Sequence, residues 1–185
     1  MAEAAQQPKP LSRSEREAQI KDKAGLVIVV MALFMAITTY FANSYSGAVM
    51  KNMLKATDTY AFFQSKSIKQ SIAEGQVEEA KKMGDKARVE KLEAKIARYE
   101  TEPATGEGKK ELLAKARAFE QARDDAAKHS PWLTFASMAF QLAIVLLSAS
   151  IIAVNNNMYK ASLGVAIVGV ILLSQGIWLW IPALF

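Results

Sequence analysis

The residue types that carry most enzyme chemistry are scarce in this sequence of 185 residues. It contains no cysteine, which excludes disulfides and thiolate chemistry, and its one histidine, His129, would need a second chain to build a histidine metal cluster. The neighbouring acids Asp124 and Asp125 point in different directions on a helix, and "TGEGKK" at 105–110 lacks the spacing of a phosphate-binding loop. We therefore predict that the protein is not an enzyme and has no catalytic residue, cofactor, metal or small-molecule substrate.

Three apolar blocks without a charged residue dominate the rest of the sequence, at 26–42, 131–154 and 161–185. About 18 apolar residues suffice to cross a bilayer core of roughly 30 Å as a helix. The blocks lack the alternation typical of barrel strands, and helices are the other structure whose backbone is satisfied in lipid. We predict an all-α integral membrane protein with a polar tail at 1–23 and three transmembrane helices, at 24–44, 131–154 and 161–183. A cleaved signal peptide is the alternative for the first block, but its hydrophilic lead is long and no clean cleavage site follows.

The extramembrane region between the first and second spans, residues 45–130, has the composition of long helices. It is rich in Ala, Lys, Glu and Arg and poor in β-branched residues. Its basic residues alternate with acids, so the net charge of +5 does not indicate a nucleic-acid partner. A turn is predicted at 101–108, where "TEPATGEG" carries one proline and two glycines, and apolar stripes at helical spacing flank it at 89–99 and 112–126. These stripes predict two antiparallel helices joined across the turn, a helical hairpin with coiled-coil-like packing.

The lengths of these predicted helices do not match. A straight helix over 49–99 would rise about 75 Å, whereas a helix over 109–128 returns only about 30 Å at 1.5 Å per residue. We therefore expect the outgoing helix to break at Gly75 or Gly84, or its first part to lie along the membrane. Residues 49–73 are then predicted to lie near the bilayer surface.

Residues 57–70, "TDTYAFFQSKSIKQ", set three large aromatics among hydroxyls, amides and lysines. Tyr60 and Phe63 continue an apolar helical stripe, while Phe62 shares another face with lysines. One interpretation is an interfacial or partner-binding helix whose lysines face phosphate headgroups. The other is a stripe that packs inside the molecule and leaves the lysines solvated. The residues predicted to contact a partner or lipid are Tyr60, Phe62, Phe63, Gln64, Lys66, Ile68 and Lys69.

The part "YAFFQSKSIK" of this segment, residues 60–69, resembles the hallmark of the bacterial domain-of-unknown-function family 4337. In that family an aromatic, two further aromatics, Gln, a small residue, Lys, a small residue, Ile and Lys follow a first membrane helix. The order of one membrane helix, a charged helical region and a closing membrane pair is also similar over most of the chain. Tyr60 stands where tryptophan is common, and Phe62 and Phe63 stand where tyrosines are. The resemblance implies a bacterial membrane protein and no particular activity.

The third span carries small residues at helical spacing, which permit close helix approach in lipid. We predict helix–helix contacts in the membrane, either to another subunit or within the three-helix unit, at Ser162, Ala166, Gly169 and Gly176. None of the polar residues at depth is ionisable, which argues against a proton relay or an ion-coupled pump.

These observations predict a protein that acts by association, as a structural or accessory subunit of a larger membrane complex or as a homo-oligomeric scaffold. Its expected partners are the lipid bilayer and further copies of the chain or other membrane-protein subunits. The alternatives are an oligomeric pore lined by Ser174 and Gln175, and a membrane-surface sensor that uses the basic amphipathic helix at 49–70. The predicted location is the bacterial inner membrane, multi-pass, with the N-terminus in the cytoplasm.

Overall fold

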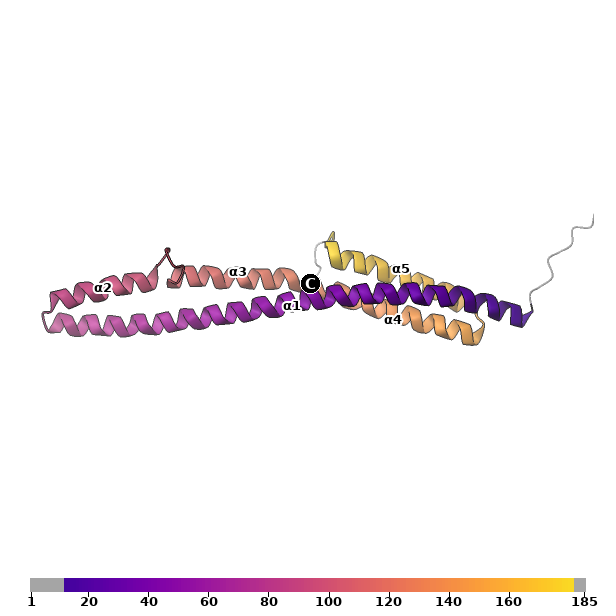
Figure 1. Cartoon of the computed structure of the whole chain (residues 1–185), viewed down its shortest axis with the longest axis horizontal. Coiled ribbons are helices and arrows are strands. Elements are labelled where there is room, and N and C mark those ends of the chain that lie inside the picture. Colours follow the sequence, from indigo (N-terminus) through magenta and orange to yellow (C-terminus); the bar gives the residue numbers. More distant parts are fainter. Residues whose placement is uncertain (1–11, 182–185) are drawn as a thin grey trace, which may run out of the picture. The chain divides into compact units, whose positions relative to one another are not determined.

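The computed structural model describes residues 12–181 as five α-helices and contains no strand within that range (Figure 1). The helices are α1 (Arg13–Lys82), α2 (Lys86–Glu100), α3 (Lys109–Ala127), α4 (Ser130–Ala153) and α5 (Asn156–Trp178). The chain divides into two compact units, of which unit 1 comprises 1–44 and 129–185 and unit 2 comprises 45–128. α1 contributes to both as one uninterrupted helix. The predicted all-helical class is confirmed.

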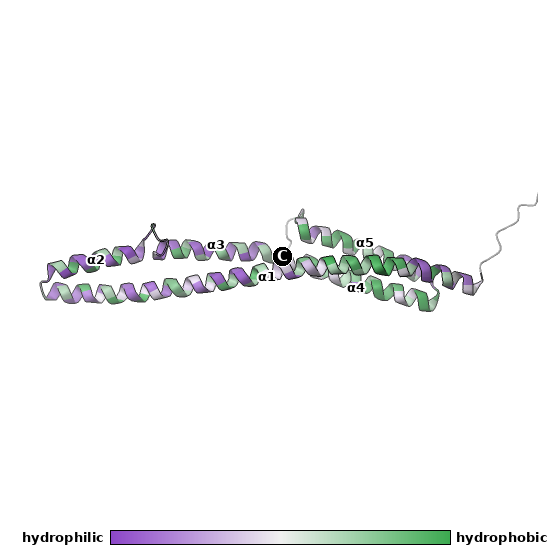
Figure 2. Ribbon diagram, in the orientation of Figure 1, coloured by the Kyte–Doolittle hydropathy of each residue, from purple (hydrophilic) through white to green (hydrophobic). Residues whose placement is uncertain are grey.

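Unit 1 contains the most apolar helices of the chain. Within residues 12–181, three helices are long and apolar enough to cross a membrane, as predicted. The apolar residues gather in the first part of α1, in α4 and in α5 (Figure 2). Large apolar side chains point outward on all three, for example Leu26, Leu142 and Ile167. Such an extended apolar surface is unusual for a helix in water and ordinary for one in lipid.

A small core holds the helices of unit 1 together. Ala24 and Met31 of α1 pack with Ala143 and Leu147 of α4, and Tyr159 of α5 borders the cluster. Ala24 and Ala143 are small, and small residues are common where helices pack against one another in lipid.

The ends of two predicted segments differ from the structure. α5 begins at Asn156 rather than at residue 161, because the side chain of Asn155 accepts a hydrogen bond from the Asn157 N–H at 2.9 Å and caps the helix. The last residues of the predicted third span, 182–183, lie outside the described residues. The predicted tail at 1–23 is helical from Arg13 onward, where Ser12 and Glu15 exchange the hydrogen bonds of a capping box.

The chain reverses direction at Gly84 and Asp85. Gly84 has a φ of +72°, and the two residues donate backbone hydrogen bonds to Lys81 and Ala80 at 3.2 and 3.1 Å, the pattern of a Schellman cap. Asp85 then caps α2 by accepting from the Arg88 N–H at 3.0 Å. Of the two predicted break points, Gly84 is therefore the one used, and Gly75 lies inside α1.

Both α2 and α3 return along α1 within unit 2 (Figure 1). Lys81 pairs with Glu93 of α2 at 3.4 Å, whereas Tyr60 bonds to Glu120 of α3 at 3.1 Å, so partner numbers rise as α1 numbers fall. The predicted hairpin across 101–108 is therefore wrong, because these residues form a loop inside the returning arm. One member of each apolar stripe contacts a lysine of α1, Tyr99 at Lys66 and Phe119 at Lys55. The spacing of a stripe does not reveal which helix covers it.

This arrangement removes the length mismatch that the sequence raised. Two helices and a loop return along one long helix, so the outgoing and returning arms cover similar numbers of residues. The reason to place residues 49–73 along the membrane surface disappears with the mismatch.

Candidate functional site

The segment 60–69 lies in the unit 2 part of α1, and its inward residues contact the returning arm. The Tyr60 hydroxyl donates to Glu120 Oε2 at 3.1 Å. The Lys109 ammonium lies 5.7 Å from the ring centre of Phe63 and donates to Gln70 Oε1 at 3.1 Å. These contacts favour the interpretation in which the stripe packs inside the molecule.

Lys66 lies in a place that the sequence did not predict. It was expected on the lysine-bearing face, but only 9% of the residue is exposed. Its Nζ lies 3.8 Å from Glu102 and 3.6 Å from Glu107, and 5.6 Å from the ring centres of both Phe62 and Tyr99. Carboxylates and aromatic faces thus replace the water that a buried ammonium loses. We call these five residues the Lys66 cage.

The cage explains why Phe62 lies among lysines. Its ring contacts the Lys66 ammonium, and the residue keeps 40% exposure toward solvent. Gln64, Ile68 and Lys69, the other members of the predicted contact set, are exposed. The predicted set therefore divides between residues that hold unit 2 together and residues that remain on its surface.

The cage links α1 to a part of the chain that is distant in sequence, the end of α2 and the loop that follows it. Lys66 comes from α1, Tyr99 from the last turn of α2, and the two carboxylates from the loop at 101–108. Its chemistry is charge neutralisation, since each carboxylate faces a cation. The cage therefore fastens the loop to α1.

Hydrogen bonding sets the ionisation of this region. The Arg98 guanidinium donates to Glu102 at 3.2 Å and lowers the pKa of that carboxyl, and the positive charges of Arg98 and Lys66 act in the same direction. Burial raises the pKa of the Tyr60 phenol, and the hydrogen bond to Glu120 raises it further. At neutral pH Glu102 is therefore ionised and Tyr60 is protonated.

We expect the 101–108 loop to loosen in acid. A carboxyl whose pKa is lowered by folding contributes stability above its ordinary pKa, and that contribution is lost as the pH falls through the lowered value. Amide hydrogen exchange of the loop, referred to the intrinsic rate at each pH, should therefore accelerate as the pH falls below the ordinary glutamate pKa of about 4.3. Glu102→Gln is the control, since it should exchange faster at neutral pH and show a smaller acid-induced change. An unaltered acid response in this variant would contradict the assignment.

Two of the small residues predicted to make contacts in the third span lie directly against α4. A Cβ added to Gly169 would come within 2.9 Å of the Phe140 ring, and one added to Gly176 within 2.8 Å of Leu133. Both distances are shorter than a van der Waals contact, so these glycines provide the space that the two large side chains occupy.

Ser162 and Ala166, the other two predicted contact residues, also face the chain's own helices. Ser162 is buried and donates to the Tyr159 carbonyl at 2.6 Å, and Ala166 borders the core cluster of unit 1. The structure thus places all four residues in packing within unit 1.

Gln175, on which the pore alternative depends, closes the end of α5. Its Nε2 donates to the Ile181 carbonyl at 2.6 Å and its Oε1 accepts from the Ile181 N–H at 3.0 Å. Both ends of the amide are therefore used within the chain. The nearby His129 places Nδ1 2.7 Å from the Gly176 carbonyl oxygen and so joins the start of α4 to α5.

Among residues 12–181, no three His, Cys, Asp or Glu side chains are placed to hold a metal ion together.

The contacts that sequence reasoning missed are the partners of Lys66. A signal was present, because Lys66 follows Phe63 by three residues on the same helical face and a lysine in a buried stripe requires a carboxylate. Glu102 and Glu107 are the two acids of the 101–108 segment.

Comparison with known proteins finds a matching family. A family model described as a domain of unknown function (DUF4337) matches residues 20–179, a range that includes the segment 60–69 and all three apolar helices. No curated protein and no solved structure is significantly similar to the chain.

Proposed function

The chain belongs to the DUF4337 family, and from that premise we propose that it is a non-catalytic membrane protein that acts by association. In this proposal it forms a homo-oligomeric scaffold through the outer face of α1 in unit 2. A structural or accessory subunit of a larger membrane complex, using the same face, is the alternative. The proposed location is the bacterial inner membrane, multi-pass, with the N-terminus in the cytoplasm, and the three apolar helices support the membrane part.

The observation that carries the proposal is a second apolar stripe on α1, on the side opposite the returning arm. Its members are exposed and lie at helical spacing over about 42 Å at 1.5 Å per residue. They are Gly47, Met50, Leu54, Ala61, Ile68, Ile72 and Gly75. We call this set the outer stripe. Met50, Leu54, Ile68 and Ile72 are each more than half exposed, which is unusual for large apolar residues spaced along one helix face.

The outer stripe is symmetric about Ala61. Its spacing of 3-4-7-7-4-3 residues reads the same from either end, with a small residue at the centre and a glycine at each end. A two-fold contact brings residue i of one copy to residue j of the other and j to i. Two antiparallel copies related by an axis through Ala61 would therefore pair Leu54 with Ile68, and Gly47 with Gly75.

Cysteine cross-linking tests this pairing cleanly, because the chain has no cysteine of its own. In bilayers under mild oxidation, Ala61→Cys is expected to cross-link to itself, since the two Cβ atoms would lie near the axis within disulfide reach. Leu54→Cys should cross-link to Ile68→Cys when the two variants are mixed, and neither should react alone. Glu78→Cys, exposed but off the stripe, is the control and should not react.

Two further measurements distinguish the antiparallel pair from a parallel pair and from a membrane-surface sensor. Self-cross-linking of Leu54→Cys would show a parallel pair and contradict the two-fold contact. Lys51 of one copy would lie on the same flank of the pair as Lys69 of the other, and the two positive charges would repel each other. Added salt screens this repulsion and should therefore strengthen the association of the two copies. Binding of the same lysines to anionic lipid would instead weaken with salt, as the membrane-surface sensor alternative requires.

A further inference from the structure

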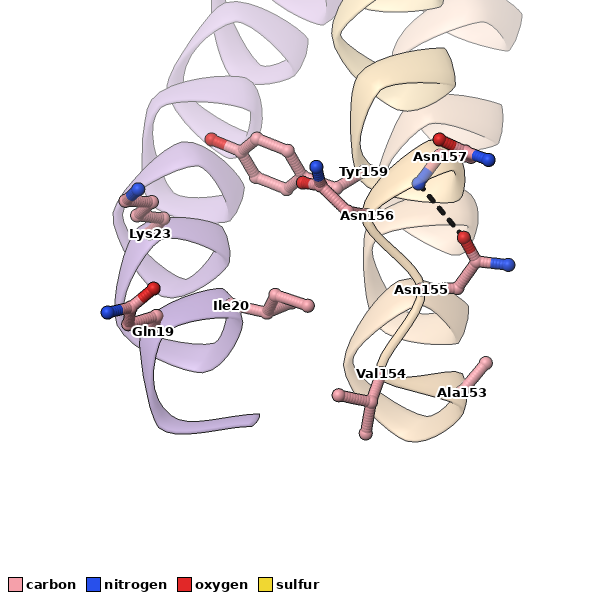
Figure 3. Close-up of a pocket in the computed structure, with 9 residues that line it drawn as sticks. All are labelled: Gln19, Ile20, Lys23, Ala153, Val154, Asn155, Asn156, Asn157 and Tyr159. Atoms are coloured by element: carbon pink, nitrogen blue, oxygen red, sulfur yellow. Dashed lines mark hydrogen bonds between the residues drawn. The ribbon is translucent and has the colours of Figure 1, made fainter. Parts of the chain in front are cut away.

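A polar groove lies at the end of unit 1 where α4 turns into α5 (Figure 3). Its volume is about 560 Å³, and it lies between the first turns of the described part of α1 and the α4–α5 connection. α1 contributes Gln19, Ile20 and Lys23, and the connection contributes asparagines together with Tyr159. Figure 3 shows the Tyr159 ring extending from α5 toward α1 across the top of the groove.

The lining of the groove suits an anion that accepts several hydrogen bonds. Lys23 supplies an ammonium with three donors, and Gln19, Asn156 and Tyr159 supply neutral donors. No carboxylate is among the described residues that line the groove, so Lys23 is the one charged side chain of this lining. A phosphate group has the matching charge and acceptors.

The groove also lies at a boundary between charged and apolar sequence. Lys23 is the last charged residue of α1 before the uncharged run 24–50, and the uncharged run 131–159 ends beside Tyr159. In a helix that crosses a membrane, such a boundary lies at the level of the lipid headgroups. Unit 1 thus presents phosphate-binding groups where phosphates of the bilayer are found.

Apolar surface next to the groove distinguishes a lipid from a free anion. Leu26, one helical turn beyond Lys23, is 70% exposed, and Ile152, just before the connection, is 84% exposed. A ligand with an anionic head and acyl chains would contact the polar lining and this apolar surface together. A free phosphate would use only the lining.

We propose that this groove binds the phosphate headgroup of an anionic phospholipid, with Lys23 as its charged contact. The polar side chains of Gln19, Asn156 and Tyr159 hold the phosphate and glycerol oxygens, and the acyl chains lie along the outer surface of α1 and α4. This lipid is a specific ligand of unit 1, in addition to the bulk bilayer around it.

The test uses the full chain in detergent and native mass spectrometry of bound lipid, with phosphatidylglycerol and phosphatidylcholine of identical acyl chains. Wild-type protein should retain phosphatidylglycerol in preference to phosphatidylcholine. Lys23→Gln should weaken phosphatidylglycerol binding about 5-fold, as expected for one lysine near a phosphate surface, and Lys23→Arg should restore it. Lys21→Gln removes the same charge two residues earlier from an exposed lysine outside the groove, and it should change binding less than about 2-fold.

Three results would overturn the proposal. The first is equal retention of the two lipids by the wild-type chain, and the second is an equal effect of Lys21→Gln and Lys23→Gln. The third is displacement of phosphatidylglycerol by a large excess of inorganic phosphate, which would assign the groove to a free anion. Far-ultraviolet circular dichroism of each variant confirms that the helices are retained.

Discussion

Lys66→Ala is expected to lower the free energy of unfolding of unit 2 by about 2 kcal/mol. Removing one member of a buried ion pair commonly costs 3–5 kcal/mol, and the estimate is reduced here because Glu107 is half exposed and both ion-pair distances exceed 3.5 Å. The change leaves Glu102 without one of its cations and empties the space between the Phe62 and Tyr99 rings. Amide hydrogen exchange of residues 101–108 in the full chain should accelerate about 30-fold.

Lys69→Ala is the matched control for this prediction. Lys69 belongs to the same segment and is exposed. Its removal should therefore change the free energy of unfolding obtained from hydrogen exchange by less than about 0.5 kcal/mol. Glu102→Ala should lose part of the same interaction, and the double variant with Lys66→Ala should lose less than the sum of the two changes. Equal effects of Lys66→Ala and Lys69→Ala would show that the cage does not stabilise unit 2.

Gly169→Leu is expected to destabilise unit 1 by about 3 kcal/mol, at the upper end of overpacking effects. A Cβ at this position already comes within 2.9 Å of Phe140, whose side chain is completely buried, so the ring has no free space into which it can move. The remaining carbons of leucine would force α4 and α5 apart. A lower midpoint of thermal unfolding in detergent is the measurement.

Gly164→Leu separates the packing effect from the general effect of replacing a glycine in this helix. Gly164 lies in α5 as well, but a Cβ there meets nothing within 4 Å. Leucine also has the higher helix propensity, so Gly164→Leu should leave the midpoint unchanged or raise it. Similar losses in both variants would contradict close packing at Gly169.

The sequence was sufficient to predict the elements and insufficient to predict how unit 2 pairs them. Uncharged runs identify membrane-length helices because lipid imposes a length and a polarity on each one separately. Gly84 could be foreseen as a break, since glycine adopts the left-handed conformation of a helix cap more readily than other residues. The loop at 101–108 contains one proline and two glycines, whereas the chain reverses at Gly84, where there is a single glycine. The place of reversal depends on which apolar helix faces pack together, here those of α1 and of the returning helices α2 and α3.

The candidate site also depends on contacts between distant residues that the sequence does not predict. Tyr60 and Phe63 could be assigned to a buried stripe from their spacing, but the neutralisation of Lys66 depends on acids about 36 and 41 positions further along the chain. Helical periodicity carries no information about contacts over such separations. Phe62 illustrates the result, because a phenylalanine among lysines looked like a partner contact and serves as one wall of the Lys66 cage.

The symmetry of the outer stripe also fixes how far the unit 2 helices of two copies would overlap. In the proposed pair, Tyr45 of one copy lies level with Val77 of the other along the helix axis, and these positions are 32 residues apart on one helix, as the numbering shows. At 1.5 Å per residue, the two copies would therefore enter unit 2 about 48 Å apart along the paired helices. The position of Ala61 in α1 would set this overlap, because the two-fold axis of the pair passes through it.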